Sequence, residues 1–127
     1  MKWLFGLLLL PLLAQAAAFD VVWSVEKLMI AGQRSRLPYQ PKWPAKQADL
    51  LSYSMTGALP KGINCQLELK LKEKLLLTMP CARSYVLERP LRITPAMRVE
   101  LYLYNANFAS PGEEVNLRNR LSLQVAD

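Results

Sequence analysis

The chain has 127 residues, of which 52% are hydrophobic, and its formal net charge is +6 at pH 7. This length permits one domain with a modest core, and the basic balance favours acidic partners, anionic glycans or a membrane surface. The sequence contains no histidine, which excludes Ser–His and Cys–His nucleophile systems and the usual zinc sites.

The first 18 residues have the features of a secretory signal peptide. Lys2 gives a positive start, residues 3–13 are apolar, and the small residues 14–18 fit the A-x-A cleavage rule twice. The apolar run is shorter than the roughly 20 residues of a membrane-spanning helix. We therefore expect cleavage; an uncleaved anchor is the alternative.

Export sets the chemical environment of the rest of the chain. Cleavage would leave a mature protein that begins near Ala17 or Phe19 and loses Lys2, which lowers the net charge by one. We expect a single β domain over 19–127, periplasmic or secreted, with no transmembrane span. Intracellular nucleic acid is then a poor partner, and disulfides persist in such compartments.

The mature part opens with a predicted strand and continues with a long basic segment. Val21, Trp23 and Val25 alternate within 19–30, which is typical of a strand. Residues 31–49 then contain three prolines and four basic residues, and we predict a loop there, because connections of that length are often functional.

Four residues of this predicted loop are candidates for binding a partner. Cationic and aromatic groups together contact sugar rings, acidic peptides or lipid head groups. The candidates are Arg34, Arg36, Tyr39 and Trp43. The alternative is a structural loop that packs Trp43 over the end of the domain while its charges stay solvated.

The two cysteines, Cys65 and Cys81, flank an alternating segment that follows a predicted strand over 50–56 and a turn signal at 59–62. Folding this segment back at Glu73 pairs Leu67 with Met79 and places the cysteines opposite each other on the apolar face. Opposed residues at such positions lie close enough for a disulfide. The wide spacing lacks the CxxC arrangement of redox-active pairs, so we predict a structural disulfide.

The C-terminal half contains further alternating segments. We predict a short strand at 85–87, and strands over 98–104 and 115–125. Six or seven short strands separated by turns indicate an all-β fold, a small antiparallel immunoglobulin-like sandwich or barrel with one disulfide.

Two of these strands add candidates for partner binding on their polar faces. Exposed tyrosines can anchor a protein interface, so Tyr102 and Tyr104 are candidates. Arg118 and Arg120 are predicted to form a basic stripe beside those tyrosines, with protection of a sheet edge as the alternative.

Catalysis finds little support in the sequence. A carboxylate pair could serve glycoside hydrolysis, but most acids fall on predicted outer faces or turns. We expect no enzymatic activity, no cofactor and no metal site.

One segment resembles a known family. Ile93, Pro95, Arg98 and Val99, followed by an alternating strand, resemble a segment of the periplasmic curli-assembly accessory family. The family's close C-x-C pair is absent, since Gln66 and Leu67 follow Cys65, and no site residue is transferred. The resemblance implies a small immunoglobulin-like sandwich that restrains amyloid subunits in the periplasm.

These observations lead to a hypothesis about function. We expect an exported, non-enzymatic protein-binding module, an accessory or chaperone in the assembly or secretion of surface fibres. Its partner would be another exported protein that is acidic or strand-forming. The alternative is a secreted enzyme inhibitor or glycan-binding module that uses the 31–49 loop.

Overall fold

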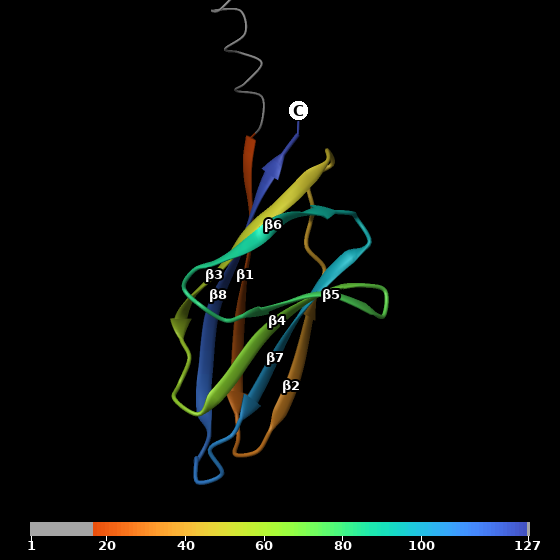
Figure 1. Cartoon of the computed structure of the whole chain (residues 1–127). Helices are drawn as coiled ribbons and strands as arrows, with labels where there is room; N and C mark the ends of the chain where they lie inside the picture. Colours follow the sequence, from red (N-terminus) through yellow and green to blue (C-terminus); the bar gives the residue numbers. More distant parts are fainter. Residues whose placement is uncertain (1–16, 127) are drawn as a thin grey trace, which may run out of the picture.

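The computed structural model describes residues 17–126, which form two four-stranded antiparallel sheets without a helix. The strands are β1 (Ala17–Met29), β2 (Arg34–Tyr39), β3 (Ala48–Ala58), β4 (Ile63–Leu71), β5 (Lys74–Pro80), β6 (Tyr85–Ile93), β7 (Met97–Asn105) and β8 (Glu113–Val125). The first sheet has the strand order β1-β8-β3-β6 and the second has β2-β7-β4-β5 (Figure 1). The predicted all-β fold is thus confirmed as a sandwich.

The predicted signal peptide lies almost entirely outside the described residues. Of residues 1–18, only Ala17 and Ala18 are described, and they open β1, where Ala17 pairs with Val125. Within the part of the chain that the structure describes, no helix is long and apolar enough to cross a membrane.

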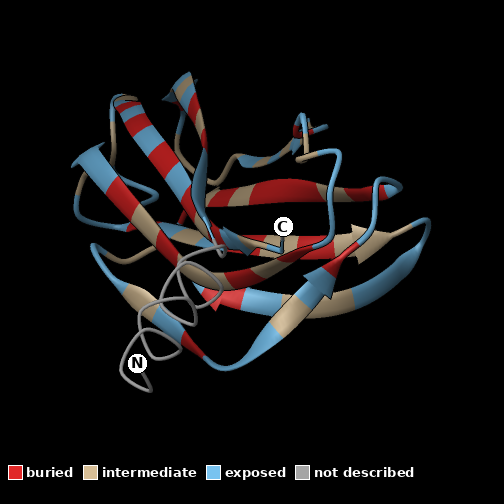
Figure 2. Cartoon of the chain, turned by 90° about the horizontal axis from the view of Figure 1, so that it is seen from above, coloured by how far each residue is buried: buried red, intermediate tan, exposed pale blue. Residues whose placement is uncertain are grey.

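Alternating side chains build the core between the two sheets. On β7, Val99, Leu101 and Leu103 are buried, and on β4, Leu67 and Leu69 are fully buried. Figure 2 shows buried and exposed positions alternating along the longer strands. Each fully buried side chain of this size stabilises the fold by roughly 1.5–3 kcal/mol, so the period-two pattern decides which face of each sheet turns inward.

The cysteine hairpin is confirmed. Leu67 pairs with Met79, and Cys65 and Cys81 form a disulfide with their Cα atoms 5.5 Å apart. The predicted turn is wrong in detail: folding back at Glu73 would pair Leu71 with Leu75, whereas Leu71 pairs with Lys74 across a two-residue turn. A β-bulge beyond this pair restores the predicted register at Leu69 and Leu77. Leu67, Leu69 and Met79 are therefore buried in the core, whereas Leu75 is exposed.

Two expectations fail at prolines. β2 lies inside the segment predicted as a loop over 31–49 and contains Pro38, and β6 runs through Pro90, past the predicted end of its strand at Leu87. Both are edge strands, where a proline at an outward-facing position removes no hydrogen bond of the sheet. β3 begins at Ala48, two residues before the strand predicted over 50–56.

Candidate binding face on the second sheet

The outer face of the second sheet brings together four of the predicted binding residues. β2 lies beside β7, with Arg34 paired to Tyr104 and Arg36 to Tyr102. The Arg34 guanidinium carbon lies 4.0 Å from the centre of the Tyr104 ring, and that of Arg36 lies 4.9 Å from the Tyr102 ring. Residues 70 and 66 positions apart in the chain thus form two cation–aromatic pairs side by side.

A cavity of about 560 Å³ opens on this face. Neighbouring β4 supplies Asn64 and Gln66, which pair with Tyr104 and Tyr102 respectively. We call the set Arg34, Arg36, Asn64, Gln66, Tyr102 and Tyr104 the Arg–Tyr face; all six line this cavity. It presents guanidinium and amide donors beside two aromatic rings, a combination suited to acidic or polar groups of a partner.

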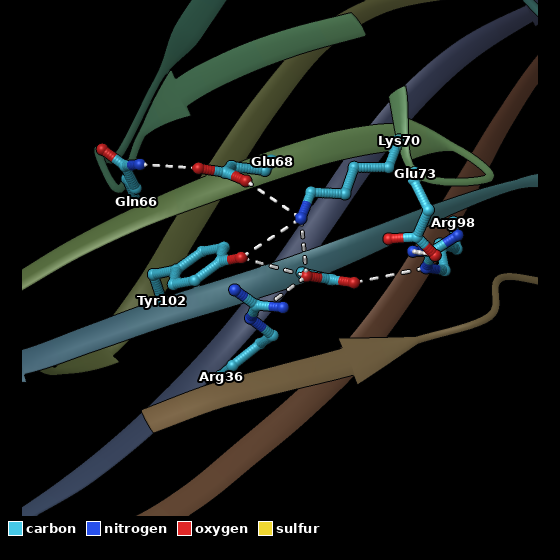
Figure 3. Close-up of polar contacts among 8 residues, drawn as sticks. Arg36, Gln66, Glu68, Lys70, Glu73, Arg98 and Tyr102 are labelled. Carbon is cyan, nitrogen blue, oxygen red and sulfur yellow. Dashed lines mark hydrogen bonds and ion pairs between the residues drawn. The ribbon is translucent and has the colours of Figure 1, made fainter. Parts of the chain in front are cut away.

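Glu100 lies next to the Arg–Tyr face and is only 4% exposed, although it points away from the core. Lys70 Nζ donates a hydrogen bond to its Oε1 (3.0 Å), the Tyr102 hydroxyl donates to the same oxygen (3.1 Å), and Arg98 Nε donates to Oε2 (3.2 Å). Arg36 Nε lies 3.5 Å from Oε1 (Figure 3). The surrounding long side chains, and not the core, therefore bury this carboxylate.

The pKa values of this cluster are shifted by its hydrogen bonds. Burial alone raises the pKa of Glu100, but the hydrogen bonds from Lys70, Tyr102 and Arg98 outweigh burial and lower this pKa below its ordinary value. The hydrogen bonds to Glu100 and then Tyr102 raise the pKa of Lys70. Both groups therefore remain charged at neutral pH, which fixes the Tyr102 hydroxyl and one side of the Arg–Tyr face.

Positive charge remains available on this face. Arg36, Lys70 and Arg98 are each engaged with Glu100, and Lys70 is also 3.6 Å from Glu68. Arg34, by contrast, has no ion pair among residues 17–126 and contacts the Tyr104 ring. Its guanidinium donors are free to receive an anionic group.

The other two loop candidates have structural contacts. The Tyr39 ring stacks on Trp23, with ring centres 4.9 Å apart, and both residues pack into the core. Trp43 Nε1 donates a hydrogen bond of 2.8 Å to the Met97 carbonyl, which also accepts from Gln40 Nε2. Neither aromatic ring joins the Arg–Tyr face.

The predicted basic stripe beside the tyrosines is wrong. Arg118 and Arg120 belong to β8, in the first sheet, whereas the tyrosines lie on β7 in the second. β8 is also central in its sheet, so these arginines protect no edge. Arg120 Nε instead lies 3.8 Å from Asp20 on neighbouring β1.

Sequence reasoning missed the amides and the centre of the charged cluster. Alternation places Asn64, Gln66, Lys70 and Glu100 on outer faces, but it does not reveal that β4 and β7 are neighbours in this register. Among the described residues, no group of three or more histidine, cysteine, aspartate or glutamate side chains is placed to hold a metal ion.

The comparisons with known proteins leave the family open. No protein-family model matches the chain, and no curated protein matches it. The chain is similar to a solved structure entitled "Crystal Structure of FLHE", with 13% sequence identity, a TM-score of 0.44, and coverage of 90% of this chain and 100% of that chain. The resemblance to the curli-assembly accessory family stays a prediction.

Proposed function

We propose that this protein is an exported, non-enzymatic module that binds another protein, acting as an accessory or chaperone in the assembly or secretion of surface fibres. The observation that carries the proposal is the Arg–Tyr face, where four of the residues selected from the sequence meet around one cavity. The disulfide between Cys65 and Cys81 is compatible with an oxidising compartment such as the periplasm.

The composition of the Arg–Tyr face favours a protein partner. Tyrosine and arginine are enriched in protein interfaces and among the residues that contribute most to binding. Here each tyrosine ring already lies against a guanidinium group, and the Tyr102 hydroxyl is held by Glu100 and Lys70. A surface that is ordered before contact loses less side-chain entropy when it binds.

Net positive charge favours an acidic partner. A fibre subunit that has not yet assembled exposes strand edges, which are prone to aggregation. A small sandwich with a cationic face can cover such edges or nearby acidic surfaces without covalent chemistry. The resemblance around Ile93 to Val99 agrees with a role in fibre assembly.

The alternative of an inhibitor or glycan-binding module loses its main support. It requires the segment 31–49 to present Tyr39 and Trp43, but one ring stacks on Trp23 and the other donates its N–H group to Met97. It is kept as an outcome of the experiment below.

Photo-crosslinking in cells tests the proposal. A photoreactive residue is placed at Asn64, an exposed member of the Arg–Tyr face, and in a matched control at Asn116, which is exposed on β8 of the first sheet. We expect Asn64 to give adducts with an exported fibre or secretion subunit, identified by mass spectrometry, and Asn116 to give none. Equal adducts from both positions, or adducts with only a lytic enzyme or cell-wall glycan, would contradict it.

The subunit identified by crosslinking can then be used in an assembly assay. The purified protein should delay assembly of the captured subunit, and the double variant Arg34→Ala with Arg36→Ala should lose most of that delay. The matched variant Arg118→Ala with Arg120→Ala alters the other sheet and should retain the delay. Loss of the delay in both variants would assign it to overall charge instead of the Arg–Tyr face.

A further inference from the structure

The backbone of β2 carries hydrogen-bonding groups on its outer edge. The Asn105 N–H group donates to the Gln33 carbonyl (3.0 Å), so Gln33 directs its carbonyl toward β7. Hydrogen-bonded positions alternate along an antiparallel pair. Ser35 and Leu37 therefore also face β7, while the backbone groups of Arg34 and Arg36 point away from it.

The far side of β7 agrees with this assignment. The Ala106 N–H group donates to the Gly62 carbonyl (2.9 Å), so even-numbered residues of β7 face β4 and odd-numbered residues face β2. Among the described strands, β2 pairs with β7 alone, and Figure 1 shows it at the margin of the second sheet. Two N–H donors, those of Arg34 and Arg36, thus lie on an unpaired edge.

Pro38 limits the length of this edge. It occupies the next outward-facing position and has no N–H group. A strand that adds here finds backbone donors at Arg34 and Arg36 only, so the pairing is short and suited to reversible contact.

The side chains beside these donors select the charge of an added strand. Residues directly opposite on paired strands interact, and opposite charges stabilise the pairing. β2 contains no acidic residue, and Arg34 has no ion pair within the described part of the chain. The complementary strand therefore carries carboxylates opposite Arg34 and Arg36, on two residues separated by one.

A second copy of this chain is a poor occupant. Pairing β2 with another β2 would bring arginines together, and like charges directly opposite are destabilising. The chain also contains no two acidic residues separated by one; its acidic residues are at positions 20, 26, 49, 68, 73, 88, 100, 113, 114 and 127. The charge pattern thus points to a different protein.

We propose that an extended segment of an exported partner, with an acidic–x–acidic pattern, adds as a strand to the edge of β2 at Arg34 and Arg36. This inference rests on the proposed function and names the partner's chemistry. Main-chain hydrogen bonds supply the pairing, and the alternating carboxylates supply its selectivity.

Amide exchange with a model peptide tests strand addition. The oxidised, ¹⁵N-labelled protein is titrated with a short acetylated peptide centred on Glu-Val-Glu, and with a control peptide centred on Lys-Val-Lys. We expect the Glu peptide to slow exchange of the Arg34 and Arg36 amides by about tenfold or more, because these N–H groups become hydrogen-bonded. The Lys peptide should not slow it.

Three controls separate backbone pairing from simple charge attraction. N-methylation of the Glu peptide at alternate residues should abolish the protection, and so should Arg34→Glu, whereas Arg118→Glu on the first sheet should leave it intact. Binding without protection of the two amides, binding that tolerates N-methylation, or no preference for the Glu peptide would overturn the proposal. If the peptide pairs as expected but cells yield no exported adduct at Asn64, the edge site stands and the proposed function fails.

Discussion

At the scale of single residues, Glu100 decides the character of the outer face. A carboxylate on a polar face is ordinarily solvated, yet here Arg36, Lys70, Arg98 and Tyr102 bury it. Removing one partner from a buried charged cluster leaves the others uncompensated and costs stability. Glu100 is therefore both a stabilising group and the support for Tyr102.

We predict that Glu100→Gln lowers the free energy of unfolding by about 2 kcal/mol at pH 7, because the hydrogen bonds to a charged acceptor are weakened. The folded-state pKa of Glu100 is lowered, so its contribution is present above the unfolded pKa of about 4.3 and is lost as the pH falls through the folded value. Urea unfolding measured at pH 7 and at acidic pH gives the drop in the free energy of unfolding on acidification. This drop should be smaller for the Glu100→Gln variant than for the parent protein. Glu26→Gln, at an exposed position on β1, is the control and should change little; equal effects of the two would refute the prediction.

A second polar pair lies inside the core. The Tyr53 hydroxyl donates a hydrogen bond of 2.6 Å to Asn119 Oδ1, and Asn119 Nδ2 has no partner among the described residues. Asn119 interrupts the apolar face of β8, and its partner Tyr53 comes from β3. The bond thus joins two strands of the first sheet.

We predict that Tyr53→Phe costs about 1–2 kcal/mol, because it leaves the Asn119 oxygen unpaired. The double variant with Asn119→Leu should be less destabilised than the sum of the two single variants, because an apolar pair leaves no buried polar atom unsatisfied. Chemical denaturation of the parent protein, the two single variants and the double variant gives the double-mutant cycle. Additive losses would show that the hydrogen bond contributes nothing.

The stability of the Tyr53→Phe variant should also depend on pH differently from that of the parent protein. Burial raises the pKa of Tyr53, so the neutral phenol stabilises the fold fully below the unfolded pKa of about 10 and that contribution is lost as the pH rises toward the folded value. Tyr53→Phe should therefore lose less stability than the parent protein between neutral and strongly alkaline pH.

At the scale of elements, strand pairing depends on close backbone approach. Gly57 in β3 has a φ of +113°, and a Cβ atom there would lie 2.2 Å from the Asn116 carbonyl oxygen of β8. Gly112 has a similar φ of +118°, but its Cβ would meet only the Leu28 side chain at 3.5 Å. The two glycines have a similar positive φ and differ in the space around them.

We predict that Gly57→Ala destabilises the protein by at least about 2 kcal/mol more than Gly112→Ala, because only the former forces the backbones of two paired strands apart. Thermal unfolding of both variants measures the difference. If the two variants have the same melting temperature, the positive φ alone determines the destabilisation, and the close approach of β3 and β8 does not contribute to it.

At the scale of the whole molecule, the disulfide agrees with the predicted export of the chain. The Cys65–Cys81 bond closes a loop with a sequence separation of 16 residues and is expected to stabilise the fold by roughly 3 kcal/mol in an oxidising compartment. The Arg–Tyr face and the β2 edge both depend on this sheet, since β4 carries Asn64, Cys65 and Gln66 in succession.

We predict that the native protein from the producing cell begins at Ala17 or Phe19 and resists alkylation until it is reduced. Intact-mass spectrometry of a periplasmic or secreted fraction, with and without a reductant, checks both points. Retention of residues 1–16, or two alkylated cysteines before reduction, would contradict the expected export and oxidation.

The sequence by itself determined the features that depend on neighbouring residues. Period-two alternation identified the strands that begin near Phe19, Arg98 and Val115, and it assigned their inward and outward faces. The cysteine pairing also followed, because both partners lie on one hairpin whose register is set by its apolar residues. Burial forces these choices, since a one-residue slip would turn a whole apolar face to solvent.

Only the tertiary structure decided which strands became neighbours. The order β2-β7-β4 brought Arg34 to Tyr104, buried Glu100 beneath Lys70, and placed Arg118 on the opposite sheet. It also made β2 an edge strand that accepts Pro38, which the sequence pattern had indicated as part of a loop. Pairing between strands that are distant in the sequence depends on how the faces of the two sheets pack together. The alternation pattern within one strand therefore does not predict which strand becomes its neighbour.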